Sequence, residues 1–111
     1  FNLNTIKKII KILNINKKII FLSDLNVNGE KNELLINILN KLEAKFYLSG
    51  DGARNFLDID KFYQNGLKIV FNKFQHPIYN QLHGEFVCNL SIIDIFFNCG
   101  VEKTKQYLNY D

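Results

Sequence analysis

Three short runs of consecutive apolar residues, separated by segments with helical spacing, constrain the fold of this chain more than any other feature. The runs lie at 18–23, 45–48 and 67–71. A continuous apolar run of this length is typical of a strand buried on both faces, as in a parallel sheet. The order helix, strand, helix, strand, helix, strand therefore predicts an α/β fold with a mostly parallel sheet of three or more strands flanked by helices.

The segments between and after these runs have the periodicity or composition of helices and loops. Apolar residues recur at steps of three and four over 3–13 and 30–42, which predicts two amphipathic helices. Short helical pieces are expected over 53–65, ending at Gly66. The segment 76–85 is expected to be a long ordered loop, and two further helices are expected at 90–97, capped by Ser91, and at 101–108.

The length and the first residue of the chain bear on its domain organisation. With 111 residues the chain fits a single α/β domain, or the carboxyl-terminal part of one. It contains no methionine and begins with Phe1, so we expect a fragment or a trimmed chain. Three strands are few for a sheet covered on both faces, and we expect the sheet to be incomplete without a missing amino-terminal half.

The composition argues against several classes of function. The net charge of +3 is spread over helix faces and strand edges, and no dense basic run interleaved with aromatics indicates nucleic-acid binding. The apolar runs are too short to span a bilayer. Cys88 and Cys99 form no CxxC pair, so we expect no zinc site but two reduced thiols, which suit a cytoplasmic protein. We expect no cofactor, and the oligomeric state is left open.

The first candidate site is the turn after the second apolar run. It contains Ser49, Gly50 and Gly52, followed by Arg54, the only arginine among the chain's 14 basic residues. Open α/β sheets bind ligands at the carboxyl ends of their strands, and the N–H groups of a following helix favour an anion, which a guanidinium could grip with two parallel bonds. The alternative is a structural turn in which Asp51 caps the helix and Arg54 pairs with Asp58.

The second candidate site is the loop that holds both histidines of the chain, His76 and His83. Either imidazole could act as a general base or acid near neutral pH. If the segment is extended, His76, Ile78 and Asn80 lie on one side, with Tyr79 and Gln81 on the other. The alternatives are a loop whose polar side chains satisfy its own backbone, and a metal site that needs a third ligand from elsewhere.

The third candidate is Asp94, which lies among isoleucine and phenylalanine residues in the apolar segment that follows. A carboxylate in such surroundings needs a partner. We expect a donor from His76, His83, Tyr79 or Arg54. The sequence leaves two roles open for Asp94, which could orient a histidine or make a purely structural hydrogen bond.

These three stretches together resemble the WbqC-like family of bacterial proteins, over about residues 46–108. The order and spacing of the matching residues are those of a family signature. The positions that carry the resemblance are Tyr47-Leu48-Ser49-Gly50, Phe56-Leu57-Asp58, Phe62, Gly66, His76-Pro77, Tyr79, Gln81, Phe86, Leu90-Ser91, Asp94, Phe97-Asn98 and Gly100. Phe56 stands where a tyrosine is frequent, and Cys88 where a proline is frequent.

The resemblance implies a cytoplasmic protein of about twice this length that acts in surface-polysaccharide (O-antigen) biosynthesis. It implies an anionic small-molecule substrate such as a nucleotide-activated sugar, and acyl or aminoacyl transfer as the reaction. On this hypothesis the turn 49–54 with Asp58, Tyr79 and Gln81 binds the substrate, His76 or His83 takes a proton, and Asp94 orients that histidine. The rival hypotheses are a non-catalytic module that binds a nucleotide sugar or a protein, and a degraded gene product without a function of its own.

Overall fold

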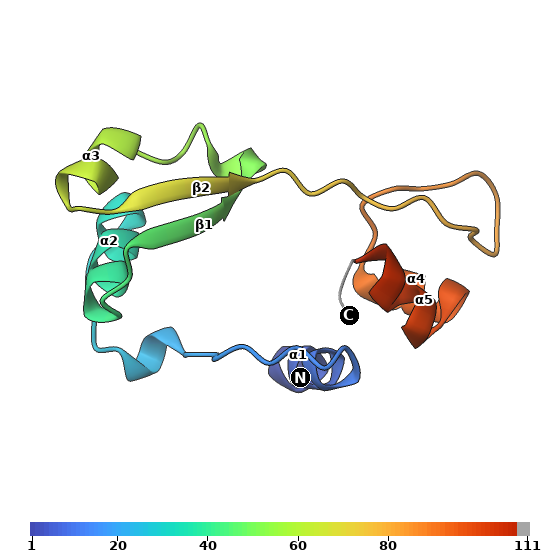
Figure 1. Cartoon of the computed structure of the whole chain (residues 1–111). Helices are drawn as coiled ribbons and strands as arrows, with labels where there is room; N and C mark the ends of the chain where they lie inside the picture. The colour runs from blue at the N-terminus through green and yellow to red at the C-terminus, as the bar shows by residue number, and fades with distance from the viewer. Residues whose placement is uncertain (109–111) are drawn as a thin grey trace. The chain divides into compact units, whose positions relative to one another are not determined.

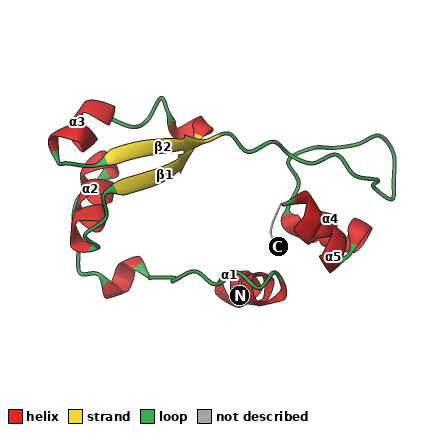
Figure 2. Ribbon diagram, viewed as in Figure 1, coloured by secondary structure: helices red, strands yellow, loops and turns green. Residues whose placement is uncertain are grey.

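The structure, a computed structural model, describes residues 1–108 and divides into two compact units. We call Ile19–Phe74 the strand unit. We call the combination of Phe1–Lys18 with the described part of Gln75–Asp111 the helical unit. The two units are described separately below (Figures 1 and 2).

The strand unit consists of a two-stranded parallel sheet and two helices, one before each strand in the sequence. In chain order its elements are α2 (Lys31–Lys41), β1 (Phe46–Gly50), α3 (Ile59–Gln64) and β2 (Lys68–Asn72). The strands pair from Phe46 opposite Lys68 to Gly50 opposite Asn72. Because the pairing is parallel, the carboxyl ends of both strands lie at the same edge of the sheet. The predicted alternation of helix and strand is confirmed for these four elements (Figure 1).

The core of the strand unit forms where both helices meet one face of the sheet. Its buried residues are Ile36 and Leu39 of α2, Phe62 of α3, and Leu67 just before β2. The ring of Phe62 is fully buried and stacks on Tyr47 of β1, with the ring centroids 5.8 Å apart. Burying a phenylalanine side chain contributes about 1.5–3 kcal/mol, so this contact is a large part of what holds α3 against the sheet.

The opposite face of the same sheet is exposed. Leu48 of β1 is 66% exposed and Val70 of β2 is 47% exposed. Strands of a doubly covered sheet carry apolar residues on both faces, which is the pattern of β1 and β2. The structure covers only the face that bears Tyr47 and Ile69, which pack against the core.

The prediction of a strand over 18–23 is wrong. Residues 18–21 form no regular element, and a short 3₁₀ turn follows at Leu22–Asp24. Ile19, Ile20 and Leu22 are 37–49% exposed. A strand needs a neighbour for its backbone hydrogen bonds, and β1 and β2 pair with each other. The sheet of residues 1–108 therefore has two strands instead of the expected three or more.

The helical unit combines α1 (Asn2–Ile12), α4 (Ile92–Cys99) and α5 (Val101–Tyr107). The hydroxyl of Ser91 accepts a hydrogen bond from the N–H of Ile93, which confirms the predicted cap of α4. Gly100 separates α4 from α5 with a φ of 78°, a conformation that favours glycine. Residues 75–90 form the expected long loop without helix or strand (Figure 2).

Within residues 1–108, no helix is both long enough and apolar enough to cross a membrane. Both cysteines are free thiols. Cys99 is partly buried, whereas Cys88 is exposed.

Substitution of Phe62 tests the role of the stacked pair in the strand unit. We expect Phe62→Ala to lower the free energy of unfolding by about 3–5 kcal/mol, because it removes a fully buried ring and leaves a cavity between α3 and β1. The control is Tyr63→Ala on the next residue, which is 56% exposed and should change stability by less than about 1 kcal/mol. Urea titration followed by circular dichroism measures both. Equal effects of the two changes would contradict the assigned core.

Candidate functional site

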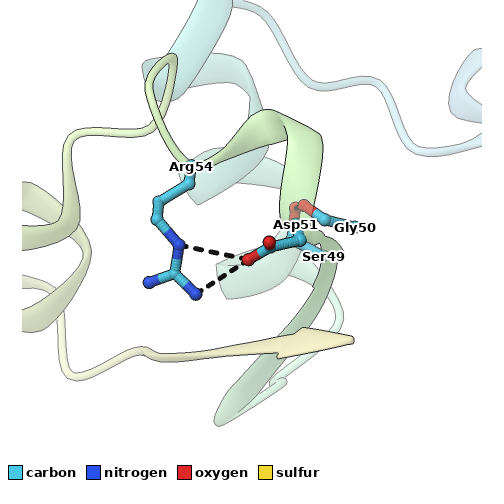
Figure 3. Close-up of polar contacts among 4 residues, drawn as sticks. All are labelled: Ser49, Gly50, Asp51 and Arg54. Atoms are coloured by element: carbon cyan, nitrogen blue, oxygen red, sulfur yellow. Dashed lines mark hydrogen bonds and ion pairs between the residues drawn. The ribbon is translucent and has the colours of Figure 1, made fainter. Parts of the chain in front are cut away.

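The guanidinium of Arg54 is held in a fixed orientation at the carboxyl ends of β1 and β2. Its Nε and Nη2 both donate to Oδ1 of Asp51, at 3.2 and 2.9 Å (Figure 3). Its Cζ lies 3.9 Å from the centre of the Phe71 ring, near the end of β2. A guanidinium over an aromatic face is attracted by the negative charge of the ring. Asp51 and Phe71 therefore fix both the edge and the plane of this group.

The side of the guanidinium away from Asp51 keeps the geometry that binds oxyanions. A guanidinium has five N–H groups, and the two bonds to Asp51 use one on Nε and one on Nη2. The remaining Nη1 and Nη2 N–H groups include the parallel pair that matches a carboxylate or a phosphate. Half of the side chain of Arg54 is exposed, so solvent and small molecules reach it. Exposed ion pairs contribute about 0–1 kcal/mol, so Asp51 orients the group without making it inaccessible to an anion.

The helix expected directly after this turn does not form there. Asp51–Ala53 is a 3₁₀ turn, and α3 begins only at Ile59. The proposed anion site therefore has no α-helix N-terminus behind it, and it depends on the Arg54 side chain. The predicted alternative pairing is also wrong, because Arg54 pairs with Asp51. Asp58 instead caps α3, accepting a hydrogen bond from the N–H of Lys61.

Ser49, Gly50 and Gly52 of the predicted turn place no charged side chain near Arg54, and the two glycines leave open space beside the backbone. Ser49 is buried in β1, and its hydroxyl donates to the carbonyl of Gly50 at 3.3 Å. A side chain added at Gly50 or Gly52 would meet no atom within 4 Å. The packing of the chain does not require glycine at these positions, and the space beside their backbone is open.

In the helical unit, Asp94 of α4 binds two side chains of the long loop. Its Oδ2 accepts hydrogen bonds from the hydroxyl of Tyr79 at 2.6 Å and from Nε2 of Gln81 at 3.2 Å. Tyr79 is buried, and its ring packs edge-to-face on Phe86 with the centroids 5.5 Å apart. A short bond from a phenol to a carboxylate is a strong, charge-assisted one. The expected partner of Asp94 is thus found in Tyr79, one of the predicted donors, together with Gln81.

Gln81 also closes the loop on itself. Its amide exchanges two bonds of 2.8 Å with the backbone of Val87, donating from Nε2 and accepting at Oε1. The predicted alternation of this segment holds from residue 78 onward, because Ile78 and Asn80 are exposed whereas Tyr79 and Gln81 point inward. It fails for His76, which was expected on the side of Ile78 but is partly buried near the rings of Tyr79 and Phe86. Residues 82–86 are therefore held as a closed loop, and Gln81 has the structural role that the sequence left open for the polar residues here.

The two histidines have different environments. Nδ1 of His76 lies 2.9 Å from the carbonyl oxygen of Pro77. A carbonyl oxygen can only accept, so in this hydrogen bond Nδ1 is the donor. His76 is partly buried, with its ring 6.1 Å from that of Tyr79 and 6.2 Å from that of Phe86. His83 is exposed in the closed loop.

The hydrogen bond to Asp94, and then burial, raise the pKa of Tyr79 above its ordinary value of 10.0. The phenol therefore stays protonated well above neutral pH, which suits a donor and not a base. No group of three or more His, Cys, Asp and Glu side chains that could hold a metal ion is found in residues 1–108.

Asn32 is a structural residue of this region that the sequence did not point to. From the first turn of α2 its Nδ2 donates to the carbonyl of Phe56 at 3.1 Å, and its Oδ1 accepts from the N–H of Asp58 at 3.0 Å. These two hydrogen bonds tie the loop after Arg54 to α2. An asparagine 24 residues away in sequence gives no local signal of such a contact.

The strand unit packs two helices against one face of a parallel pair of strands, with an oriented arginine at the carboxyl ends of those strands. The chain belongs to the WbqC-like protein family, which its sequence matches over residues 1–106. This match extends over the amino-terminal segment, beyond the 46–108 that carried the resemblance.

A relative from Mycobacterium tuberculosis, the uncharacterised protein Rv1507c, is 32% identical over 88 residues. The alignment covers 78% of this chain and 38% of the relative, so the chain spans well under two thirds of that protein's length. No solved structure matches the chain significantly.

The raised pKa of Tyr79 predicts a pH dependence of stability. A phenol whose pKa is higher in the folded than in the unfolded chain stabilises the fold fully below the unfolded pKa, near 10.0, and this contribution is lost as the pH rises through the folded pKa. We expect the melting temperature of the wild type to fall more steeply above pH 10 than that of Tyr79→Phe. Parallel slopes from pH 8 to 11 would contradict the Tyr79–Asp94 bond.

The clasp between Gln81 and Val87 predicts a local change in hydrogen exchange. We expect Gln81→Ala to speed amide exchange at Val87 at least about tenfold, since the acceptor of that N–H is removed. Asn80→Ala, on the exposed side of the same segment, is the matched control and should leave that rate unchanged. NMR-detected exchange measures both variants. Unchanged protection in Gln81→Ala would show that another group holds the loop.

Proposed function

We propose that this member of the WbqC-like family binds an anionic sugar derivative, a nucleotide-activated sugar, and acts in surface-polysaccharide (O-antigen) biosynthesis. The observation that carries the proposal is the guanidinium of Arg54, half exposed and fixed by Asp51 and Phe71 at the carboxyl ends of two parallel strands. The biosynthetic setting is the one that the resemblance to the WbqC-like family implies, and the geometry of Arg54 supports an anionic ligand.

The physical argument for an anionic ligand rests on orientation. A flexible arginine loses side-chain entropy when it closes on a phosphate, whereas Arg54 is already held by two bonds and a ring. Open space beside Gly50 and Gly52 allows a ligand to approach the backbone next to it. The carboxyl edge of a parallel sheet is the usual ligand position in α/β proteins.

Transfer of an acyl or aminoacyl group to an amino sugar is the reaction that we propose for this family member. The amine nitrogen attacks the acyl carbon, the N–C bond forms, and the bond to the leaving group breaks with its electron pair. In this proposal His76 takes the proton that the amine loses. Asp94 supports this base indirectly, by fixing Tyr79 and Gln81 of the loop that follows it.

A non-catalytic binding module is the second candidate, and the pairing of Asp94 favours it. The carboxylate that the sequence offered as an orienting group for a histidine accepts bonds from Tyr79 and Gln81. These bonds give the carboxylate a complete structural role. A binding module predicts affinity for the nucleotide sugar without turnover.

Thermal shift of the chain with a panel of nucleotide sugars tests the binding proposal. A ligand at 100 times its dissociation constant stabilises the folded state by about 2.7 kcal/mol. We expect a shift in the wild type that is lost in Arg54→Ala and reduced in Arg54→Lys, which keeps the charge but not the parallel N–H pair. Lys61→Gln, an exposed cation in α3, is the control and should bind as the wild type does. Equal shifts in the wild type and Arg54→Ala would refute an anion site at Arg54.

Turnover separates the two candidate functions. Candidate acyl donors are incubated with amino-sugar nucleotides, and products are measured by mass spectrometry. We expect product from the wild type and a loss of about 100-fold or more in His76→Ala, with little change in His83→Ala. Product formation that is unchanged in His76→Ala would exclude it as the base, and binding without any product would favour the binding module.

A further inference from the structure

A hollow of about 620 Å³ lies in the strand unit between the first turns of α2 and the loop that follows Arg54. Its walls are mostly apolar and come from Leu35 of α2, Tyr47 of β1, Ala53 of the 3₁₀ turn before Arg54, and Phe56 and Leu57 of the loop after it. Pockets that hold small molecules have volumes of roughly 300–1,000 Å³ and mainly apolar walls with a few polar groups. Both the size and the lining of this hollow fit that class of site.

The polar residues of the hollow have separate roles. Asn32 uses both ends of its amide to hold the loop, at the carbonyl of Phe56 and the N–H of Asp58. It therefore builds the wall, and its amide already uses one N–H and one oxygen lone pair for this purpose. Lys31 and Asn55 also line the hollow. Lys31 is the cation of the lining and Asn55 contributes an amide, so the charge of the lining favours an acidic group on the ligand.

The hollow is distinct from the Arg54 site. Ala53 and Asn55 line it, but Arg54 between them lies against Phe71 and Asp51. Ala53 and Asn55 thus border the hollow, whereas Arg54 contacts other residues. A ligand in the hollow meets Lys31 as its cation, and its binding does not depend on the guanidinium.

Phe56 supplies a further reason to expect an occupant. Its side chain is 79% exposed although it lines the hollow, and its backbone carbonyl is tied to Asn32. An exposed aromatic ring at an apolar hollow gains free energy when a second apolar group covers it. An apolar body in the hollow would cover part of the Phe56 ring.

We propose that this hollow binds a small molecule that has an aromatic or apolar body and a single anionic group. The body packs against Leu35, Tyr47 and Phe56, and the anionic group lies next to Lys31. This is a second ligand site in the strand unit, for a molecule whose recognition is mainly apolar, in contrast to the sugar derivative proposed for Arg54.

Two probes of the same shape test the proposal. 2-Naphthoate carries an aromatic body and a carboxylate, and 2-naphthalenemethanol has the same body without the charge. Each is titrated into the ¹⁵N-labelled 111-residue chain, and amide shifts are followed by NMR. We expect saturable shifts at Leu35, Ala53, Asn55 and Leu57 with both probes, and tighter binding of the naphthoate.

Variants assign the two parts of the site. Lys31→Gln should weaken naphthoate about threefold to fivefold, the range of an exposed charge pair, and leave the alcohol unchanged. Ala53→Leu should weaken both probes by filling the hollow. Phe56→Ala should also weaken both, and since this ring is largely exposed the variant keeps the fold if Ala53→Leu does not. Lys61→Gln and Arg54→Gln are the controls, and both should bind the naphthoate as the wild type does.

Several outcomes would overturn the proposal. These are shifts that do not saturate, shifts that lie outside the lining residues, and full affinity for both probes in a folded Ala53→Leu or Phe56→Ala. Loss of naphthoate binding in Arg54→Gln with none in Lys31→Gln would place the anion at Arg54 and overturn the assignment of a separate site. Shifts of the same amides with protein concentration alone would make the hollow a contact between copies of the chain. Loss of the Arg54-dependent thermal shift with nucleotide sugars would leave this proposal standing.

Discussion

The strand unit depends on the burial of Phe62 between α2, α3 and the face of β1 that bears Tyr47. A two-stranded parallel sheet has few hydrogen bonds of its own and needs a covered face to be stable. The stacked rings of Tyr47 and Phe62, with Ile36 and Leu39 behind them, provide that cover. The register of β1 on β2 follows, and with it the position of Gly50 opposite Asn72 at the edge where Arg54 lies.

At that edge the residues before and after Arg54 border two different surfaces, for which we propose two different ligands. On one side, Arg54 is braced by Asp51 and by the ring of Phe71, an arrangement suited to an oxyanion. On the other side, Asn32 ties the loop to α2 and leaves an apolar hollow with Lys31 in its lining. The same backbone segment therefore contributes to both surfaces, because Ala53 and Asn55 border the hollow whereas Arg54 between them contacts Asp51 and Phe71.

In the helical unit, side-chain hydrogen bonds hold a loop that has no regular structure. Asp94 holds Tyr79 and Gln81, and Gln81 holds Val87, so three side chains replace the backbone ladder that an extended segment lacks. Buried polar groups stabilise a loop of this kind only when each has a partner. Asp94, which the sequence offered as catalytic, and Tyr79 and Gln81, which it offered as substrate-binding, are therefore first of all the framework of the loop.

The sequence by itself determined the elements whose signals are local. Helical periodicity gave α1 and α2, Ser91 and Gly66 marked the ends of helices, and the alternation around Tyr79 separated the inward side chains of the loop from the outward ones. The order of residues also carried the family, since spacing along the chain is itself a sequence property.

Tertiary structure decided everything that needs a partner distant in sequence. The apolar run at 18–23 has the composition of a strand, but composition does not provide a neighbouring strand, and the run stays outside the sheet. Arg54 had acidic residues three positions before and four positions after it, and the 3₁₀ turn, not helical spacing, brought Asp51 to it. The two hydrogen bonds of Asn32 and the hollow beside it form only because α2 and the loop after Arg54 lie next to each other in the fold.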